Sequence, residues 1–161
     1  MLSNNANAFA ITRANNYQIP VHVSDRAEFK NPEHILAVMD QWQVDAIALA
    51  GFLWLIPNFL IDRFPNSILN IHPALLPKFG GKGMYGRHVH QAVLDAAESE
   101  SGITIHLVNQ HYDQGQIIFQ AKCKVEAQDT PEILAARIHK LEHEFYPKII
   151  EQWLTSAEVK L

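Results

Sequence analysis

Cysteine is almost absent from this sequence, since the 161 residues contain only Cys123. A single thiol excludes an internal disulfide and any metal site built on a pair of cysteines. It also suits a reducing compartment, so we expect a cytoplasmic protein. Residues 1–7 have neither a basic start nor an apolar segment, and the sequence therefore predicts no secretory signal.

Long apolar runs and an excess of positive charge are also missing. The longest apolar run, residues 46–57, is far short of the ~20 residues that a membrane helix needs, so we expect no membrane partner. The 17 Asp and Glu residues outnumber the 13 Lys and Arg residues, and a formal charge of −4 offers no basic surface for nucleic acid. With 48% hydrophobic residues and no linker or repeat, residues 1–161 are expected to form one domain that binds small molecules.

The order of the predicted elements indicates an α/β fold. Apolar spacing predicts helices over residues 6–16, 31–42, 59–64, 88–97 and 129–153, the last of them broken in two at Pro147. Strands are predicted at residues 19–23, 45–51, 67–72, 103–108 and 117–125. Asn31 and Pro32 form a typical helix start, with Asn31 as the cap. Strands that alternate with helices in this way are typical of a parallel sheet.

The most informative polar residues lie in the stretch 67–77. Asn70 and His72 alternate with apolar residues, so on a strand both polar side chains point to the same face, and Pro73 ends the strand. An amide and an imidazole therefore lie together at the carboxyl end of a strand, where open α/β sheets bind ligands. The loop that follows is rich in glycine, which lets backbone approach a ligand closely.

Together with Asp113, these two residues can support acyl transfer to an amine. The Asn70 amide can donate a hydrogen bond to the oxyanion of a tetrahedral intermediate, and a histidine can move protons near neutral pH. We expect the Asp113 carboxylate to orient His72, to raise its pKa and to favour the imidazolium form. No serine or cysteine nucleophile is needed, because the amine of the substrate attacks.

Three motifs carry a resemblance to a known family, namely Leu69-Asn70-Ile71-His72-Pro73, Leu75-Leu76-Pro77 and Asp113-Gln114-Gly115. They closely resemble the folate-dependent formyltransferases, and among them those that act on glycinamide ribonucleotide in purine biosynthesis. The resemblance implies a Rossmann-like fold, with a mostly parallel sheet and helices on both faces. It also implies formyl transfer from the co-substrate 10-formyltetrahydrofolate, with Asn70, His72 and Asp113 as catalytic residues. A homodimer is compatible with it.

The resemblance assigns further residues to the two substrates. The reduced folate would bind among Leu53, Trp54, Leu55, Ile61, Val108, Asn109, Gln110, His111 and Tyr112. Glycinamide ribonucleotide would contact Ile71 and Pro73, and Glu142 would hold its amine end. Plainer interpretations stay open, since Trp54 can be an ordinary core residue and Glu142 an ordinary solvated helix carboxylate.

The histidines could in principle bind a metal instead. His88 and His90 are two residues apart, and on a helix such residues do not share a face. His106 and His111 lie further along the chain, and no His-Glu-x-x-His motif is present. We therefore expect no metal site.

The opening strand and glycine-rich phosphate loop of the family have no counterpart in this sequence, whose residues 2–5 align with the family's second strand. Roughly thirty residues are expected to be missing, including the helix N-terminus that cradles the substrate phosphate. A misassigned start, a truncated chain or a degenerate protein would each explain this. On any of these grounds we expect weak ribonucleotide binding and impaired activity.

Two other functions stay open on sequence alone. One is a formyltransferase that acts on another amine, such as a methionyl-tRNA or a sugar nucleotide, although those relatives usually carry a further C-terminal domain. The other is a non-catalytic folate-binding remnant whose sheet pairs with a second copy. An intact enzyme binds both folate and ribonucleotide, whereas the remnant binds folate alone.

Overall fold

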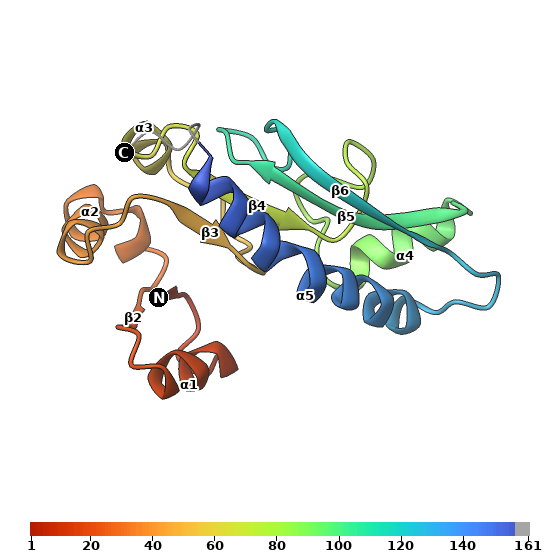
Figure 1. Ribbon diagram of the computed structural model, residues 1–161, viewed down its shortest axis with the longest axis horizontal. Coiled ribbons are helices and arrows are strands. Elements are labelled where there is room, and N and C mark those ends of the chain that lie inside the picture. The colour runs from red at the N-terminus through yellow and green to blue at the C-terminus, as the bar shows by residue number, and fades with distance from the viewer. Residues whose placement is uncertain (157–161) are drawn as a thin grey trace. The chain divides into compact units, whose positions relative to one another are not determined.

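The computed structural model describes residues 1–156 and divides into two units, Met1–Val44 and the chain from Asp45 onward. Each unit has its own sheet and helices (Figure 1). Within residues 1–156, no helix combines the length and the apolar character needed to cross a membrane. The expectation of one domain across the whole chain stays a prediction.

The first unit contains a parallel pair of very short strands with helices around it. Its elements in chain order are β1 (Leu2–Ser3), α1 (Phe9–Asn16), β2 (His22–Val23), the 3-10 helix η1 (Glu28–Lys30) and α2 (Pro32–Gln41). Strand β2 is shorter than the predicted strand 19–23, in which Pro20 has no N–H to donate to a neighbouring strand.

The start of α2 follows from its sequence. The side-chain oxygen of Asn31 accepts hydrogen bonds from the backbone N–H groups of Glu33 and His34, at 3.1 and 3.4 Å. Pro32 occupies the first helical position, where its missing N–H costs nothing. The predicted Asn31 cap is confirmed, and this cap fixes where the His34 side chain leaves the helix.

The second unit is built on a four-stranded sheet with the order β3-β4-β5-β6. The strands are β3 (Ile47–Leu49), β4 (Ile68–His72), β5 (Glu100–Leu107) and β6 (Ile117–Lys124). Strands β3 and β4 are parallel, and β5 and β6 extend the sheet in antiparallel fashion. The predicted Rossmann-like α/β class is confirmed, with β1 to β4 in parallel pairs and helices between them. The alternation of apolar and polar residues along a strand shows which face each side chain occupies, but it does not show the direction of the strand. The sequence therefore did not reveal that β5 and β6 are antiparallel.

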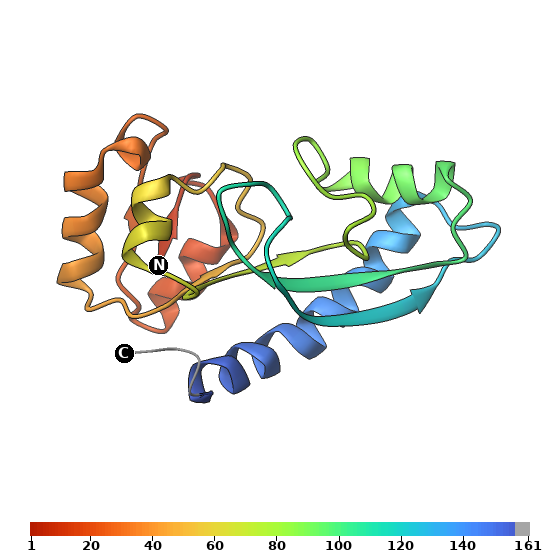
Figure 2. The same ribbon diagram turned by 90° about the horizontal axis from the view of Figure 1, so that it is seen from above.

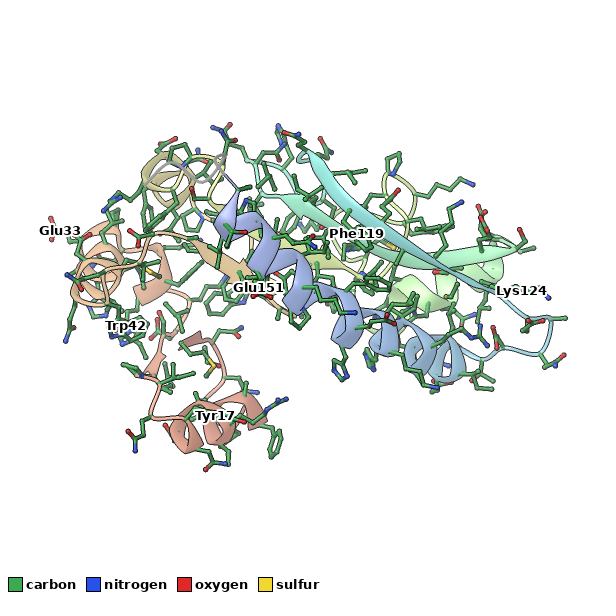
Figure 3. All side chains as sticks on the ribbon, viewed as in Figure 1. Tyr17, Glu33, Trp42, Phe119, Lys124 and Glu151 are labelled. Carbon is green, nitrogen blue, oxygen red and sulfur yellow. The ribbon has the colours of Figure 1, made fainter. Side chains whose placement is uncertain are left out.

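Three helices accompany this sheet, α3 (Asn58–Arg63), α4 (Arg87–Asp95) and α5 (Pro131–Thr155). Helix α5 runs along the sheet, and α4 packs against α5 (Figure 2). The apolar cluster between the sheet and these helices contains Leu69, Ile71, Val93, Ile103, Ile105, Leu134, Ile138, Tyr146 and Trp153. On β6, the ring of Phe119 (Figure 3) lies 5.1 Å from the ring of Phe145 on α5.

The predicted break at Pro147 is wrong, because α5 continues through it. Pro147 is exposed, so water can satisfy the helix carbonyl that loses its N–H partner. Tyr146 and Trp153, on either side of the proline, are both buried against the sheet, and their packing stabilises the continuous helix. The Tyr146 hydroxyl donates to the carbonyl of Leu49 at 2.8 Å and lies 3.2 Å from that of Leu69, which ties α5 to β3 and β4.

Candidate active site

The face of the sheet turned away from the apolar cluster is polar along β4. Asn70 and His72 lie on this face, as their alternation predicts, while Leu69 points into the apolar cluster. The antiparallel register places His106 of β5 opposite Asn70 and Thr104 opposite His72. Residues directly opposite one another on antiparallel strands share a face. Four polar side chains from two strands therefore lie together.

The structure brings Asp113 to His72, although the two residues are far apart in the sequence. Nδ1 of His72 lies 3.5 Å from Oδ2 of Asp113, and Nε2 donates to the backbone carbonyl of Phe79 at 2.8 Å. The same Asp113 oxygen accepts a hydrogen bond from the N–H of Gly81 at 2.8 Å. Only 3% of the surface of His72 is exposed. The segment 79–81 thus encloses the imidazole and holds the carboxylate beside it.

Burial lowers the pKa of His72, although Asp113 and the Phe79 carbonyl both act to raise it and His106 lowers it further. Asp113 does act to raise the pKa of His72, as expected, but burial outweighs it, so the net pKa lies below the usual value and the imidazolium form is not favoured. The carboxylate does attract a proton to the ring, but removing the ring from water opposes the charge more strongly. At neutral pH His72 is an imidazole with its hydrogen on Nε2, and Nδ1, beside Asp113, is the atom that can accept a proton.

Asp113 is ionised in this setting. Burial by itself would raise its pKa, but His106 and His72, in their protonated forms, and the Gly81 N–H together lower it. A carboxylate with these neighbours can receive a proton from a reacting amine and pass it to an imidazole. The ionised Asp113 carboxylate and Nδ1 of His72 lie 3.5 Å apart.

His106 orients the Asn70 amide, and sequence reasoning considered this histidine only as a possible metal ligand. Its Nδ1 lies 2.9 Å from the carbonyl of Leu107, which requires the hydrogen to be on Nδ1. Its Nε2 then accepts a hydrogen bond from Nδ2 of Asn70 at 3.1 Å and lies 3.6 Å from Oδ1 of Asp113. The amide of Asn70 is thereby fixed with its second N–H available to a ligand. The period-2 alternation of residues 103–108 predicts that His106 shares a face with Thr104, but only the strand register of the fold places it opposite Asn70.

Gly115 and Gly80 both make close contacts that shape the Asp113 loop, and at Gly115 the contact is with backbone atoms, so glycine is required there. A Cβ on Gly115 would lie 1.7 Å from the carbonyl oxygen of Leu107, so this loop can approach β5 only with glycine there. A Cβ on Gly80 would lie 2.5 Å from Leu76 Cδ2 and 3.1 Å from the Cβ of Asp113. Asp113 itself has a φ of 56°, in the left-handed region that aspartate tolerates better than most residues. These contacts explain why the motif Asp113-Gln114-Gly115 has an aspartate at its first position and a glycine at its third.

Thr104 fastens the segment after β4 to the sheet. Its hydroxyl donates to the carbonyl of Ala74 at 2.7 Å and accepts from the N–H of Leu76 at 2.9 Å. Gln120 of β6 donates both to Thr104 Oγ1 at 2.9 Å and to the carbonyl of Leu76 at 3.0 Å. This network fixes the start of the loop that encloses His72.

His90 on α4 is a second residue whose place sequence reasoning missed. It is 3% exposed, and its Nδ1 has no hydrogen-bond partner among the described residues. Burial lowers the pKa of His90, and the nearby His139 and His72 lower it further. His90 therefore lies within electrostatic reach of both the β4 site and helix α5.

Glu142 lies one turn after His139 on α5, with 4.0 Å between the His139 Nε2 and the Glu142 Oε2. Burial raises the pKa of Glu142, against the effect of His139 and His143. The predicted glutamate is therefore a half-buried carboxylate near histidines rather than a fully solvated one. Its contact with a substrate amine stays a prediction.

The predicted folate-binding residues lie in three segments of the second unit. Residues 53–55 follow β3, with Leu53 50% and Leu55 45% exposed, so apolar surface is accessible there. The Trp54 ring contacts the ring of Phe52 edge-on, with centroids 5.7 Å apart, and Ile61 is half-buried on α3. Residues 108–112 lead from β5 into the Asp113 loop, and their role in binding folate also stays a prediction.

The two predicted substrate contacts next to His72 differ in what they can offer. The Ile71 side chain is buried in the apolar cluster on the other face, so only its backbone is available on the polar side. Pro73 is half-buried at the end of β4.

Comparison with known proteins agrees with the motifs. The family model described as "Formyl transferase" matches residues 1–150. The chloroplastic phosphoribosylglycinamide formyltransferase of Arabidopsis thaliana is 47% identical over 137 residues, which is 82% of this chain and 47% of that protein. The phosphoribosylglycinamide formyltransferase of Haemophilus influenzae is 38% identical over 165 residues, covering 100% of this chain and 75% of that protein.

Solved structures give the same result. The crystal structure of phosphoribosylglycinamide formyltransferase from Bacillus halodurans matches with a TM-score of 0.86 and 30% identity, covering 97% of this chain and 80% of that one. The chain spans about half the length of the plant relatives that it matches. On the family match, the identities and the shared fold, the chain belongs to the formyl transferase family, where these relatives are phosphoribosylglycinamide formyltransferases.

Proposed function

We propose that this protein transfers the formyl group of 10-formyltetrahydrofolate to the amine of glycinamide ribonucleotide, a step of purine biosynthesis. The observation that carries the proposal is the meeting of Asn70, His72 and Asp113 on one face of β4. An amide donor, an imidazole and an ionised carboxylate are the groups that acyl transfer to an amine needs. The names of the relatives supply the identity of the amine.

The proposed reaction forms one bond and breaks another at the formyl carbon. The amine nitrogen of the ribonucleotide bonds to that carbon, and the bond from the carbon to N10 of the folate breaks. The second N–H of Asn70 donates to the carbonyl oxygen while it carries negative charge. The amine loses one proton, N10 gains one, and Asp113 with His72 carries the proton between them.

Access to His72 requires a local movement. Its Nε2 now donates to the Phe79 carbonyl, and the ring is almost fully enclosed. In the proposal, substrates displace the segment 79–81, after which Nε2–H faces the reacting atoms. Glu142 binds the amine end of the ribonucleotide, and the segments 53–55 and 108–112 bind the folate. We further propose that the chain acts as a single formyltransferase domain, that it works in the cytoplasm and that it forms a homodimer. The names of the plant relatives make the chloroplast the alternative compartment.

Substitution of Asn70 tests the proposal. Asn70→Ala removes the donor to the oxyanion, and we expect turnover to fall by roughly 10²–10³-fold. The matched control is Asn15→Ala, since Asn15 is exposed on α1 and has no part in the site. Turnover is followed as the release of tetrahydrofolate. An unchanged rate in Asn70→Ala would remove this residue from its proposed role.

A binding experiment separates enzyme from remnant. A non-reactive folate analogue is titrated into the protein with and without glycinamide ribonucleotide. The proposal expects both ligands to bind, the ribonucleotide weakly, in keeping with the expectation from the sequence. Binding of the folate analogue alone, with no formyl transfer, would identify a non-catalytic folate-binding protein instead.

A further inference from the structure

Two histidines and a glutamate converge in the first unit, whereas the residues of the proposed reaction belong to the second. Nε2 of His22 and Nε2 of His34 lie 3.3 Å apart. Glu28 reaches both, with Oε1 2.7 Å from the His34 nitrogen and Oε2 3.7 Å from the His22 nitrogen. The ligand atoms of all three side chains lie within 4.8 Å of one another, and within residues 1–156 this is the one such group that could hold a metal ion.

Each member of this His22–Glu28–His34 cluster is held in place by its own backbone feature. His22 lies on β2, and its N–H donates to the carbonyl of Met1 at 3.0 Å. Glu28 begins η1, where Oδ1 of Asp25 accepts from the N–H of Glu28 at 2.8 Å. His34 lies in the first turn of α2, which the Asn31 cap fixes. The three donor groups are therefore brought together before any ligand binds.

We propose that His22, Glu28 and His34 form a binding site for one divalent transition-metal ion of the zinc class. Two ligand atoms that each lie about 2.05 Å from a tetrahedral zinc ion are about 3.3 Å apart, which is the separation of the two imidazole nitrogens. Rotation of the Glu28 carboxylate, which is only one-third exposed, brings one oxygen to a third corner. The three side chains are only partly buried, so water is the expected fourth ligand.

The types of ligand atom indicate which metal ions the site would bind. Two imidazoles and one carboxylate suit Zn²⁺, Co²⁺ and Ni²⁺, whereas Ca²⁺ and Mg²⁺ prefer sites made of oxygen alone. The ion would join β2, η1 and α2, three elements of the first unit, and so stabilise that unit. The inference goes beyond the proposed formyl transfer and does not depend on it. No metal site was predicted from the sequence, because only the histidines between residues 88 and 111 were considered as ligands.

Zinc titration of the full chain tests the site. The protein is first treated with a chelator, and Zn²⁺ is then added in a calorimeter, where we expect one ion to bind per chain. Loss of one ligand should weaken the affinity by more than about 100-fold, since even an outer-shell partner is worth 10–100-fold. His22→Gln, His34→Gln and Glu28→Gln are therefore each expected to abolish stoichiometric binding. Circular dichroism confirms that each variant is folded.

Matched controls and a second metal sharpen the result. Glu33 (Figure 3), one residue before His34, is exposed, and His88 lies exposed on α4, so Glu33→Gln and His88→Ala should bind zinc like the unsubstituted chain. Co²⁺ in the same site should give the strong visible absorption of tetrahedral cobalt with nitrogen ligands. Absence of stoichiometric zinc binding, or binding that persists in both His22→Gln and His34→Gln, would overturn the proposal.

Discussion

Gly115→Ala perturbs the candidate site through sterics alone. The added methyl group would lie 1.7 Å from the carbonyl oxygen and 2.7 Å from the carbonyl carbon of Leu107. Both atoms belong to the backbone of β5, so no side chain can turn aside to make room. The loop that carries Asp113 must move instead.

The size of the effect follows from this overlap. Ordinary contact between a methyl carbon and an oxygen requires the loop to retreat by about 1.5 Å. Overpacking of this kind costs about 1–3 kcal/mol of unfolding free energy, or more where backbone must shift. Asp113, two residues earlier, moves with the loop and away from Nδ1 of His72, now 3.5 Å distant. A misplacement of about 1 Å at a reacting group costs roughly 10²-fold in rate.

Three measurements test the prediction for Gly115→Ala, and a second glycine substitution serves as the steric control. Urea unfolding gives the stability, an NMR titration follows His72, and formyl transfer gives the rate. Since Asp113 acts to raise the pKa of His72, its retreat should lower that pKa further. Gly102→Ala is the control, because its Cβ would lie 2.0 Å from the carbonyl oxygen of Ala121 at the opposite end of β5, and its other close contact, 2.8 Å to Cδ2 of Leu75, is with the end of a side chain that can turn aside. It should destabilise the fold comparably and leave the titration of His72 unchanged.

The reasoning would be refuted by a folded Gly115→Ala protein in which His72 titrates as before and formyl transfer proceeds at the original rate. It would also fail if Gly102→Ala disturbed His72 as much as Gly115→Ala does. Either result would mean that the Asp113-Gln114-Gly115 loop does not set the position of the carboxylate.

Two further predictions concern stability. Tyr146→Phe removes the hydroxyl that donates to Leu49, and we expect it to lower the free energy of unfolding by about 1–2 kcal/mol, measured in urea. Tyr17→Phe, at a residue that is 77% exposed, should change it by less than about 0.5 kcal/mol, and equal effects would contradict the structural role of Tyr146. Burial holds the pKa of His72 and His90 below 6.5 in the folded chain, so the unfolded chain takes up their protons first as the solution becomes acidic. The stability that the neutral rings contribute is complete above pH 6.5 and is lost as the pH falls below it. His90→Gln should make this loss of stability smaller. An unfolding free energy that does not change between about pH 8 and pH 5 would contradict the lowered pKa values of the two histidines.

Local patterns carried much of the fold. The cap at Asn31, the helix over α3 and the strand with alternating Asn70 and His72 all follow from residues within one or two turns of each other. Such features depend on short-range sterics and hydrogen bonding, which a sequence shows directly. The break at Pro147 failed for the opposite reason: packing of Tyr146 and Trp153 against distant strands overrode the local preference of proline.

At the candidate site, too, some features could be predicted from local sequence and others depend on contacts between distant residues. The motifs indicated Asn70, His72 and Asp113, but not the residues that hold them. The Phe79 carbonyl accepts a hydrogen bond from His72 and the Gly81 N–H donates one to Asp113, because a glycine-rich loop folds over the site, and no periodicity predicts these contacts. Asp113 raises the pKa of His72 as predicted, but the net pKa is lowered because burial, which depends on everything that surrounds the ring, has the larger effect.

By itself the sequence determined the α/β character, the shared face of Asn70 and His72, and the family, because periodicity and motifs are written along the chain. Only the tertiary structure decided that His106 orients the amide, that burial outweighs Asp113 at His72, and that His22, Glu28 and His34 meet. These last relations join residues through strand register, loop closure and exclusion of water. Such quantities belong to the assembled fold and to no single stretch of the chain.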